Sequence, residues 1–223
     1  MRPRTYLFIA LLLLFASTAS PAQTSVAASL YGAFNGATNG NGTQESPANQ
    51  AGALFELRQI KNPLVGYEAT YSWNRANQGL ASASAICPAG GSCTVSSAAI
   101  SSDAHEVTAD WVVSMKFANL RPFALAGGGI LVDVPTGGTV TTISCGEFNP
   151  LCAAGTTPAA TSTSTKGVFV YGGGLDWGLL PHIGLRLQYR GNLYKAPDLV
   201  NAFSSTGAFM HTAEPMIGVY FRL

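Results

Sequence analysis

Apolar and polar residues alternate with a period of two through most of the chain. In the segment LVGYEATYSW, residues 64–73, Tyr67, Tyr71 and Trp73 share one face of an extended backbone, and Glu68 and Thr70 lie on the other. This period predicts a β-strand between two unlike environments. Eight segments carry the pattern, and we predict strands at Val26–Phe34, Gly52–Ile60, Leu64–Trp73, Ala104–Phe117, Arg121–Val132, Gly167–Trp177, Ile183–Leu193 and Phe209–Leu223.

The connections between these strands alternate in length. Three are tight turns, at Lys61–Pro63, Ala118–Leu120 and Gly178–His182. Four are long and rich in Gly, Ser, Thr and Asn, at Asn35–Ala51, Asn74–Asp103, Asp133–Lys166 and Tyr194–Ala208. Short turns at one end and long loops at the other are typical of outer-membrane barrels, and most of the strands reach the ~9–11 residues that a bilayer crossing needs. We therefore predict an all-β fold, an eight-stranded antiparallel up-and-down transmembrane β-barrel.

Charge and the first residues of the chain fit this prediction. Arg2 and Arg4, the apolar run Leu7–Ala16 and the small residues Ser20–Ala22 form the pattern of a secretory signal peptide. We assign residues 1–22 to the signal peptide and 23–223 to the barrel domain. Only 10% of the chain is charged, against about 25% in soluble domains. Without the leader, ten basic residues face eleven acidic ones, a balance that does not favour nucleic acid as a partner.

The polar faces of the strands carry small residues and charges of both signs. Such faces suit the narrow interior of an eight-stranded barrel, where side chains fill the lumen, because a charge facing mid-bilayer costs roughly 2–4 kcal/mol if basic. We predict an ion network inside the lumen from acidic and basic residues that share this face: Glu56, Arg58, Glu68, Glu106, Asp110, Lys116, Asp176, Arg186, Arg190, Glu214 and Arg222.

The apolar faces carry aromatic residues in two groups. The strand order places Tyr71, Trp73, Phe169 and Tyr171 near the long-loop end, and Phe117, Phe123, Trp177 and Phe221 near the short-turn end. Aromatic side chains form such belts at the two interfaces of a membrane. We therefore expect the apolar faces to contact lipid.

Four cysteines lie in the two longest loops. In an exported chain they are read first as disulfides, and the local pairs Cys87–Cys93 and Cys145–Cys152 are the easiest of three connectivities to close. Each would stabilise its loop by roughly 2–3 kcal/mol in the loop-entropy model. A metal site is the rival interpretation, but the spacing is not that of a zinc ribbon and neither segment contains histidine. We expect no metal and no cofactor.

The whole mature chain resembles the small eight-stranded outer-membrane barrels of the OmpA/OmpX type. The most specific element is the last strand, in which Gly218, Phe221 and Leu223 match the Gly-x-x-Φ-x-Φ signal that the barrel-assembly machinery reads in this family. The chain departs from the family in ending on Leu223 rather than Phe. The resemblance implies location in the bacterial outer membrane, with outer-membrane lipid or lipopolysaccharide and the assembly machinery as partners, and we expect a monomer.

Three functions remain open at this point. We expect a filled lumen below extracellular loops that serve surface binding, adhesion or envelope integrity. A small solute pore is the second hypothesis. A lipid A-modifying enzyme is the third, because His105 and His211 lie near the long-loop end with Ser101, Ser102, Asp103 and Glu214 nearby in sequence. No nucleophile–base spacing supports it, so we expect no catalytic residues and no enzyme activity.

Overall fold

The structure, a computed structural model, describes residues 23–61, 64–82, 93–145 and 152–223, with the side chain of Cys93 excepted. No helix in these ranges is long and apolar enough to cross a membrane. The chain forms strands throughout, in the order β1 Gln23–Asn35, β2 Thr38–Gly40, β3 Thr43–Pro47, β4 Gln50–Ile60, β5 Val65–Ser82, β6 Cys93–Ser114, β7 Leu120–Cys145, β8 Ala153–Pro158, β9 Ser164–Gly178, β10 Ile183–Lys195 and β11 Phe209–Arg222.

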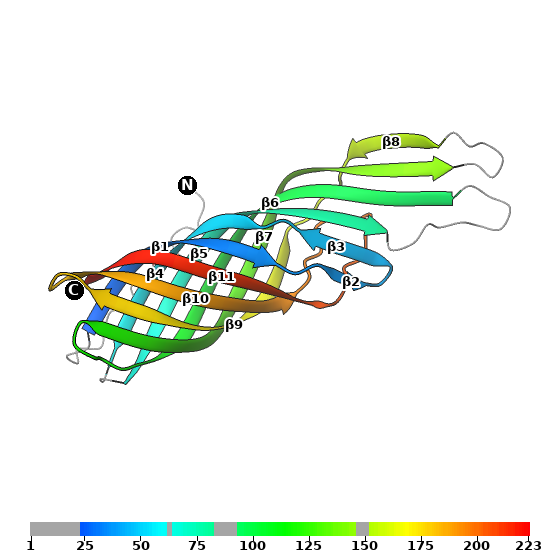
Figure 1. Ribbon diagram of the computed structural model, residues 1–223. Helices are drawn as coiled ribbons and strands as arrows, with labels where there is room; N and C mark the ends of the chain where they lie inside the picture. Colours follow the sequence, from blue (N-terminus) through cyan, green and yellow to red (C-terminus); the bar gives the residue numbers. More distant parts are fainter. Residues whose placement is uncertain (1–22, 62–63, 83–92, 146–151) are drawn as a thin grey trace, which may run out of the picture.

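Eight of these strands close into an antiparallel barrel (Figure 1). Its wall runs β1, β4, β5, β6, β7, β9, β10 and β11, and every neighbouring pair is antiparallel. Pairing of β1 with β11, for example Ser29 with Gly218, closes the cylinder. The predicted fold class, strand number and closure are confirmed.

Three wall strands extend far beyond their predicted ends. β5 continues to Ser82, β6 begins at Cys93 and β7 continues to Cys145. Together with β8, which pairs with β7, they form a sheet that projects from the long-loop end of the barrel (Figure 1). The loops predicted there are therefore largely strand, because their Ser, Thr and Ala residues pair in register although they show little apolar–polar contrast.

The burial of the strand residues shows which face of each strand lines the inside of the barrel. In β5, Glu68, Thr70 and Ser72 are buried inside the cylinder. Their sequence neighbours Tyr71 and Trp73 point outwards and are 39% and 42% exposed. The charged face is thus inside and the aromatic face outside, the reverse of a soluble domain.

A small apolar cluster lies above the barrel, where the sheet projects. Leu80 of β5 and Ala98 and Ile100 of β6 pack there against Leu199 and Val200 of the β10–β11 connection. Val140, Ala159 and Phe203 cover its sides. We call these eight residues the outer cluster; it gives the projecting sheet a core of its own.

Candidate functional site

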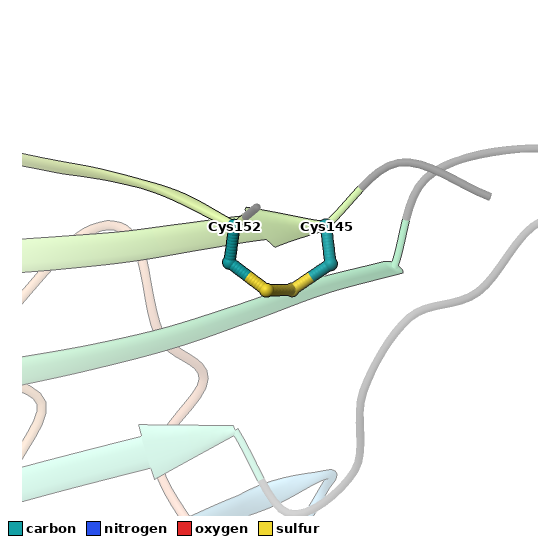
Figure 2. The surroundings of a disulfide bond; sticks show 2 residues. All are labelled: Cys145 and Cys152. Atoms are coloured by element: carbon teal, nitrogen blue, oxygen red, sulfur yellow. A yellow bond between two sulfur atoms is a disulfide. The ribbon is translucent and has the colours of Figure 1, made fainter. Parts of the chain in front are cut away.

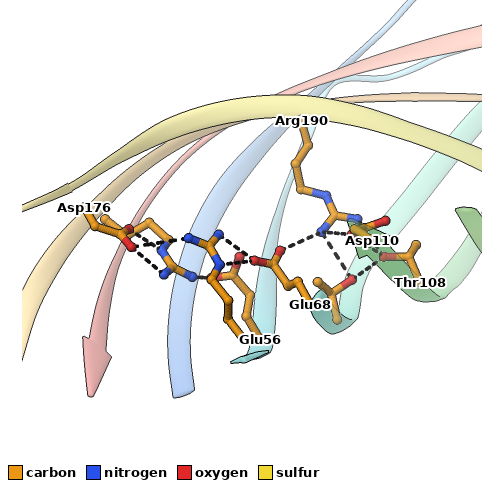
Figure 3. A network of polar contacts seen from close by, with 9 residues as sticks. Glu56, Glu68, Thr108, Asp110, Asp176 and Arg190 are labelled. Carbon is orange, nitrogen blue, oxygen red and sulfur yellow. Dashed lines mark hydrogen bonds and ion pairs between the residues drawn. The ribbon is translucent and has the colours of Figure 1, made fainter. Parts of the chain in front are cut away.

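Two arginines organise the half of the lumen nearer the short turns (Figure 3). Arg186 of β10 donates to both oxygens of Asp176, with Nε–Oδ1 and Nη2–Oδ2 distances of 2.7 and 2.9 Å, and its Nη1 lies 3.0 Å from Oε2 of Glu56. Arg58 of β4 pairs with Glu68 and reaches Asp176 at 3.3 Å. Both guanidinium groups are buried, so each depends on these carboxylates for compensation.

Phe123 lies inside this layer, which corrects its predicted place in an aromatic belt. Its ring is buried, and the guanidinium carbons of Arg58 and Arg186 lie 3.9 and 5.4 Å from the ring centroid. Gly174 on the neighbouring strand makes room, because a Cβ there would come within 2.7 Å of the ring. A flat ring that stacks on two cations fills the lumen without needing a hydrogen bond.

Arg190 organises the second layer, nearer the long-loop end. Its guanidinium group contacts Glu106 at 3.3 Å and donates to Thr70 at 3.2 Å. It also contacts Asp110 at 3.6 Å and donates to Thr108 at 3.1 Å (Figure 3). Asn192 donates to the other oxygen of Glu106 at 3.0 Å. Glu214 is buried beside this layer and forms no ion pair within the described residues.

The outer mouth of the lumen is closed by neutral polar side chains. Tyr31 donates to Asn74 at 3.2 Å, and Thr212 donates to Asn35 at 2.6 Å while bonding to Tyr194 at 3.0 Å. The cavity that remains among them is about 30 Å³. That is room for about two water molecules, so the mouth offers no space for a solute.

Two members of the predicted ion network lie outside it. Lys116 follows the end of β6 at Ser114 and is exposed at the short-turn rim. Arg222 lies at the same rim and donates to the hydroxyl of Tyr220 at 3.1 Å. Lys116 lies beyond the end of β6, and Arg222 is the last residue of β11, paired with Ser25. Both follow the period of their strands but lie too close to the strand ends to reach the lumen network, so the alternation alone places them wrongly. The other predicted acidic and basic residues all lie in the lumen.

The predicted disulfide between Cys145 and Cys152 is present, with a Cα–Cα distance of 4.2 Å (Figure 2). It joins the end of β7 to the start of β8 at the tip of the projecting sheet. The predicted Cys87–Cys93 pair lies outside the described residues. Within the described residues, no group of three or more His, Cys, Asp or Glu side chains could hold a metal ion.

Both candidate histidines sit on the outward face among tyrosines. Nδ1 of His105 lies 2.9 Å from the Tyr71 hydroxyl, and Nε2 of His211 lies 2.9 Å from the Tyr171 hydroxyl. Of the residues considered as partners, Ser102 and Glu214 are buried on the opposite, inward face. Ser101 and Asp103 share the outward face of β6 with His105. Asp103 pairs with Arg75 at 3.7 Å, however, and neither Ser101 nor Asp103 forms a side-chain hydrogen bond with a histidine in the described residues. The absence of enzyme activity stays a prediction.

The predicted assembly signal occupies the strand that closes the barrel. Gly218 is buried against Ser29, and a Cβ in its place would meet the Ser29 hydroxyl. Phe221 points outwards and is 48% exposed, and Leu223 is 77% exposed. Recognition of these residues by the assembly machinery stays a prediction.

A buried acidic group at the long-loop end was not predicted. Glu45 of β3 is buried and both of its oxygens lack a hydrogen-bond partner in the described structure. Burial, with the negative charges of Asp133 and Asp198, raises the pKa of Glu45 to about 7. Lys166, which pairs with Asp198 at 2.8 Å, opposes this shift. Glu45 lay in a predicted loop, and no sequence signal indicated its burial.

No protein-family model and no curated protein matches the sequence. Among solved structures, the chain is similar to Ail, the attachment invasion locus protein of Yersinia pestis, at 13% identity and a TM-score of 0.45, covering 92% of this chain and 100% of that one. It is also similar to Neisserial surface protein A at 11% identity and 0.48, covering 90% and 97%. The outer membrane protein OprG from Pseudomonas aeruginosa matches at 10% and 0.48, covering 91% and 96%. These are small outer-membrane barrels, and the likeness concerns fold alone.

Proposed function

We propose that this protein is a monomeric outer-membrane barrel whose sealed cylinder anchors a projecting sheet that binds a partner at the cell surface. One observation carries the proposal: β5, β6, β7 and β8 continue past the barrel as an ordered sheet with its own apolar core and a disulfide at its tip. Strand pairing and the disulfide hold this surface in one shape, which lowers the entropic cost of binding.

The outward faces of the barrel strands support the membrane location. Exposed aliphatic residues such as Leu30 and Leu187, 69% and 53% exposed, lie between Tyr and Trp residues at the two ends. A soluble protein rarely exposes a continuous apolar surface of this kind. A bilayer would cover it, as it covers the apolar band of other strand-built membrane proteins.

The filled lumen disfavours the pore hypothesis. Three arginines, six carboxylates and the Phe123 ring occupy it, and a cluster that includes Val112, Leu125 and Val170 packs beside them. Conduction would require these buried ion pairs to open, and breaking one costs several kcal/mol. The function we favour therefore lies on the surface of the projecting sheet rather than in a channel.

The projecting sheet also indicates the kind of partner. Residues 94–102, 134–145 and 152–165 contain no charged side chain, and Ser and Thr are abundant among them. Such a surface recognises a partner by hydrogen bonds and shape rather than by steering charge. We expect a neutral partner, such as an uncharged polysaccharide or protein surface, and binding that changes little with salt.

The test removes the tip of the sheet and leaves the barrel intact. Residues 140–157 are replaced by Asn-Gly, a two-residue turn that suits the adjacent pair Thr139 and Pro158. Cells of a non-adherent bacterial strain that display the wild-type chain should adhere to matrix-protein or polysaccharide coatings, and cells with the shortened chain should not. Double substitution Cys145→Ala and Cys152→Ala, which retains the surface but loosens it, should weaken adherence less.

Experiments on the same protein and its variants distinguish the pore and enzyme hypotheses from surface binding. Stable conductance steps in planar bilayers that shift with Glu68→Gln would favour a pore. A mass change in lipid A on expression, lost with His105→Ala or His211→Ala, would establish an enzyme. Equal adherence of wild-type and shortened chains would contradict the binding proposal, and heat-modifiable gel mobility shows that each variant has folded.

A further inference from the structure

A basic cavity opens at the short-turn end of the barrel, remote from the projecting sheet. Its volume is about 300 Å³, ten times that of the outer mouth, and it lies between the β6–β7 and β9–β10 turns and the end of β11. Lys116, Arg121 and Arg222 line it, and none of its lining residues is acidic. The two turns that frame it, Ala118–Asn119 and Leu179–Pro181, meet through a hydrogen bond from Gly178 to the Asn119 carbonyl.

The three cations of this cavity form no ion pair within 4 Å among the described residues. Every ion pair there uses other basic side chains, namely Arg58, Arg75, Lys166, Arg186 and Arg190. Arg121 and Arg222 also lie near enough to repel each other electrostatically. Asp176 offsets part of the charge of Arg121 from a distance, but no carboxylate lines the cavity, so the three cations together create a local field that favours an anion.

Arg121 shows why the protein itself does not supply that anion. Its cross-strand neighbour in β9 is Asp176, the acid that would ordinarily pair with it. Both oxygens of Asp176 are already engaged by Arg186 at 2.7 and 2.9 Å, and one also by Arg58. As a result Nε of Arg121 is buried without an acceptor. A buried charged donor with no partner is costly, and an acceptor from outside the chain would remove that cost.

The rim of the cavity is apolar. Leu120, Leu179 and Leu180 are 41%, 49% and 60% exposed beside the cations. Outward-facing Phe117 and Trp177 lie on the same end of the wall. Cations beside exposed leucines, at the end of a wall whose outward face is apolar, match an amphiphile with an anionic headgroup and acyl chains.

We propose that this cavity binds the phosphate group of an anionic phospholipid in the inner leaflet of the membrane. The phosphate accepts hydrogen bonds from Arg121 and Arg222, and Lys116 adds charge. Leu179 and Leu180 lie beside the headgroup, and the acyl chains run towards the bilayer centre past the exposed pair Leu120 and Trp177 at the end of the wall. The proposal rests on the membrane location proposed above but not on any function of the projecting sheet. Free inorganic phosphate shares the headgroup chemistry, but it would make no use of the leucine rim.

Native mass spectrometry of the refolded mature chain, released from mixed micelles, tests the site. The lipids are phosphatidylglycerol and the zwitterionic phosphatidylcholine. One phosphatidylglycerol should be retained in preference to phosphatidylcholine, and Arg121→Gln combined with Arg222→Gln should reduce retention about tenfold, as expected for loss of one or more charge-assisted hydrogen bonds. Arg121→Lys with Arg222→Lys keeps the charge and should restore part of the retention.

Two matched controls change the same charge elsewhere. Lys61→Gln lies at the short-turn end but does not line the cavity, and Lys195→Gln lies at the long-loop end. Both should leave retention within about twofold, and heat-modifiable mobility must show that all variants fold. Equal loss in the controls, equal retention of both lipids, or displacement of the lipid by micromolar inorganic phosphate would overturn the proposal. Failure of the sheet to bind a surface partner would leave this result unchanged.

Discussion

The inward face of the wall changes character between the barrel and the projecting sheet. In β5, Glu68 within the barrel and Leu80 above it lie on the same inward face, and Asp110 and Ile100 do so in β6. Charges are buried in the barrel, whose outer face we propose meets lipid, and aliphatic side chains are buried in the projecting sheet, which we propose meets water. The surrounding solvent therefore decides which kind of residue is placed inside, while the strand and its period continue unchanged.

β7 contains a β-bulge between its barrel part and its part in the projecting sheet. Its register against β6 shifts between Ser101 and Ser102, so that Ser101 faces Gly137 and Ser102 faces Pro135. Thr136 is the extra residue, and its hydroxyl donates to the Ser101 carbonyl at 3.1 Å. Because a bulge reverses which alternate residues point inwards, Val140 turns towards Ile100 in the outer cluster. The two regions differ in register as well as in composition.

Arg186→Met is expected to destabilise the barrel more than any of the other substitutions. It leaves Asp176 and Glu56 buried without their main counterion, so we expect a loss of about 3–5 kcal/mol in the free energy of unfolding. Urea unfolding of the refolded chain in lipid vesicles, followed by tryptophan fluorescence, measures it. Arg75→Met removes an exposed pair with Asp103 at 3.7 Å and should change stability by less than about 1 kcal/mol. Similar losses for both would contradict the buried network.

Leu187→Lys places a charge at the residue after Arg186, on the outward face of β10. Leu187 is 53% exposed on the outside of β10, midway between the aromatic residues of the two ends. A lysine there should cost about 2–4 kcal/mol in a bilayer and far less in a soluble sheet. The same urea titration measures it. An unchanged midpoint would indicate that water, not lipid, meets this face.

Ile100→Ala tests the projecting sheet alone. It leaves a cavity in the outer cluster, and we expect a local loss of about 2–3 kcal/mol because the cluster is small. Amide hydrogen exchange of residues 94–102 should quicken, while exchange within the barrel part of β6 stays the same. Uniform quickening along β6 would show instead that barrel and sheet unfold as one unit.

The effect of Glu45→Gln is confined to the β2–β3 hairpin and depends on pH. Burial raises the pKa of folded Glu45 from 4.5 to about 7. The folded β2–β3 hairpin therefore loses stability as the pH rises from 4.5 to about 7, and its stability does not fall further above pH 7. We expect the variant to protect the amides of residues 38–47 by about 3 kcal/mol more than wild type at pH ~8. The difference should vanish below pH ~4.5; a constant difference would contradict ionisation as the cause.

The β2–β3 hairpin at the long-loop end had a sequence signal that the apolar–polar alternation does not contain. Asn41 and Gly42 both have positive φ, 50° and 74°, and form the two-residue turn between β2 and β3. An Asn-Gly pair is the strongest short-range signal for such a hairpin. The extensions of β5, β6 and β7 had no comparable signal, because Ser, Thr and Ala suit either side of a strand at a wet surface.

The amino-acid sequence by itself determined the eight wall strands, their antiparallel order and, with the exception of Phe123 in β7, which alternate residues point outwards, because the two faces of each wall strand carry residues of opposite character. Only the tertiary structure decided which charges meet. Arg186 reaches Glu56 three strands away across the lumen, and Phe123 turns inwards to stack on Arg58. Closure of the cylinder makes these contacts, and a period of two contains no information about what lies opposite.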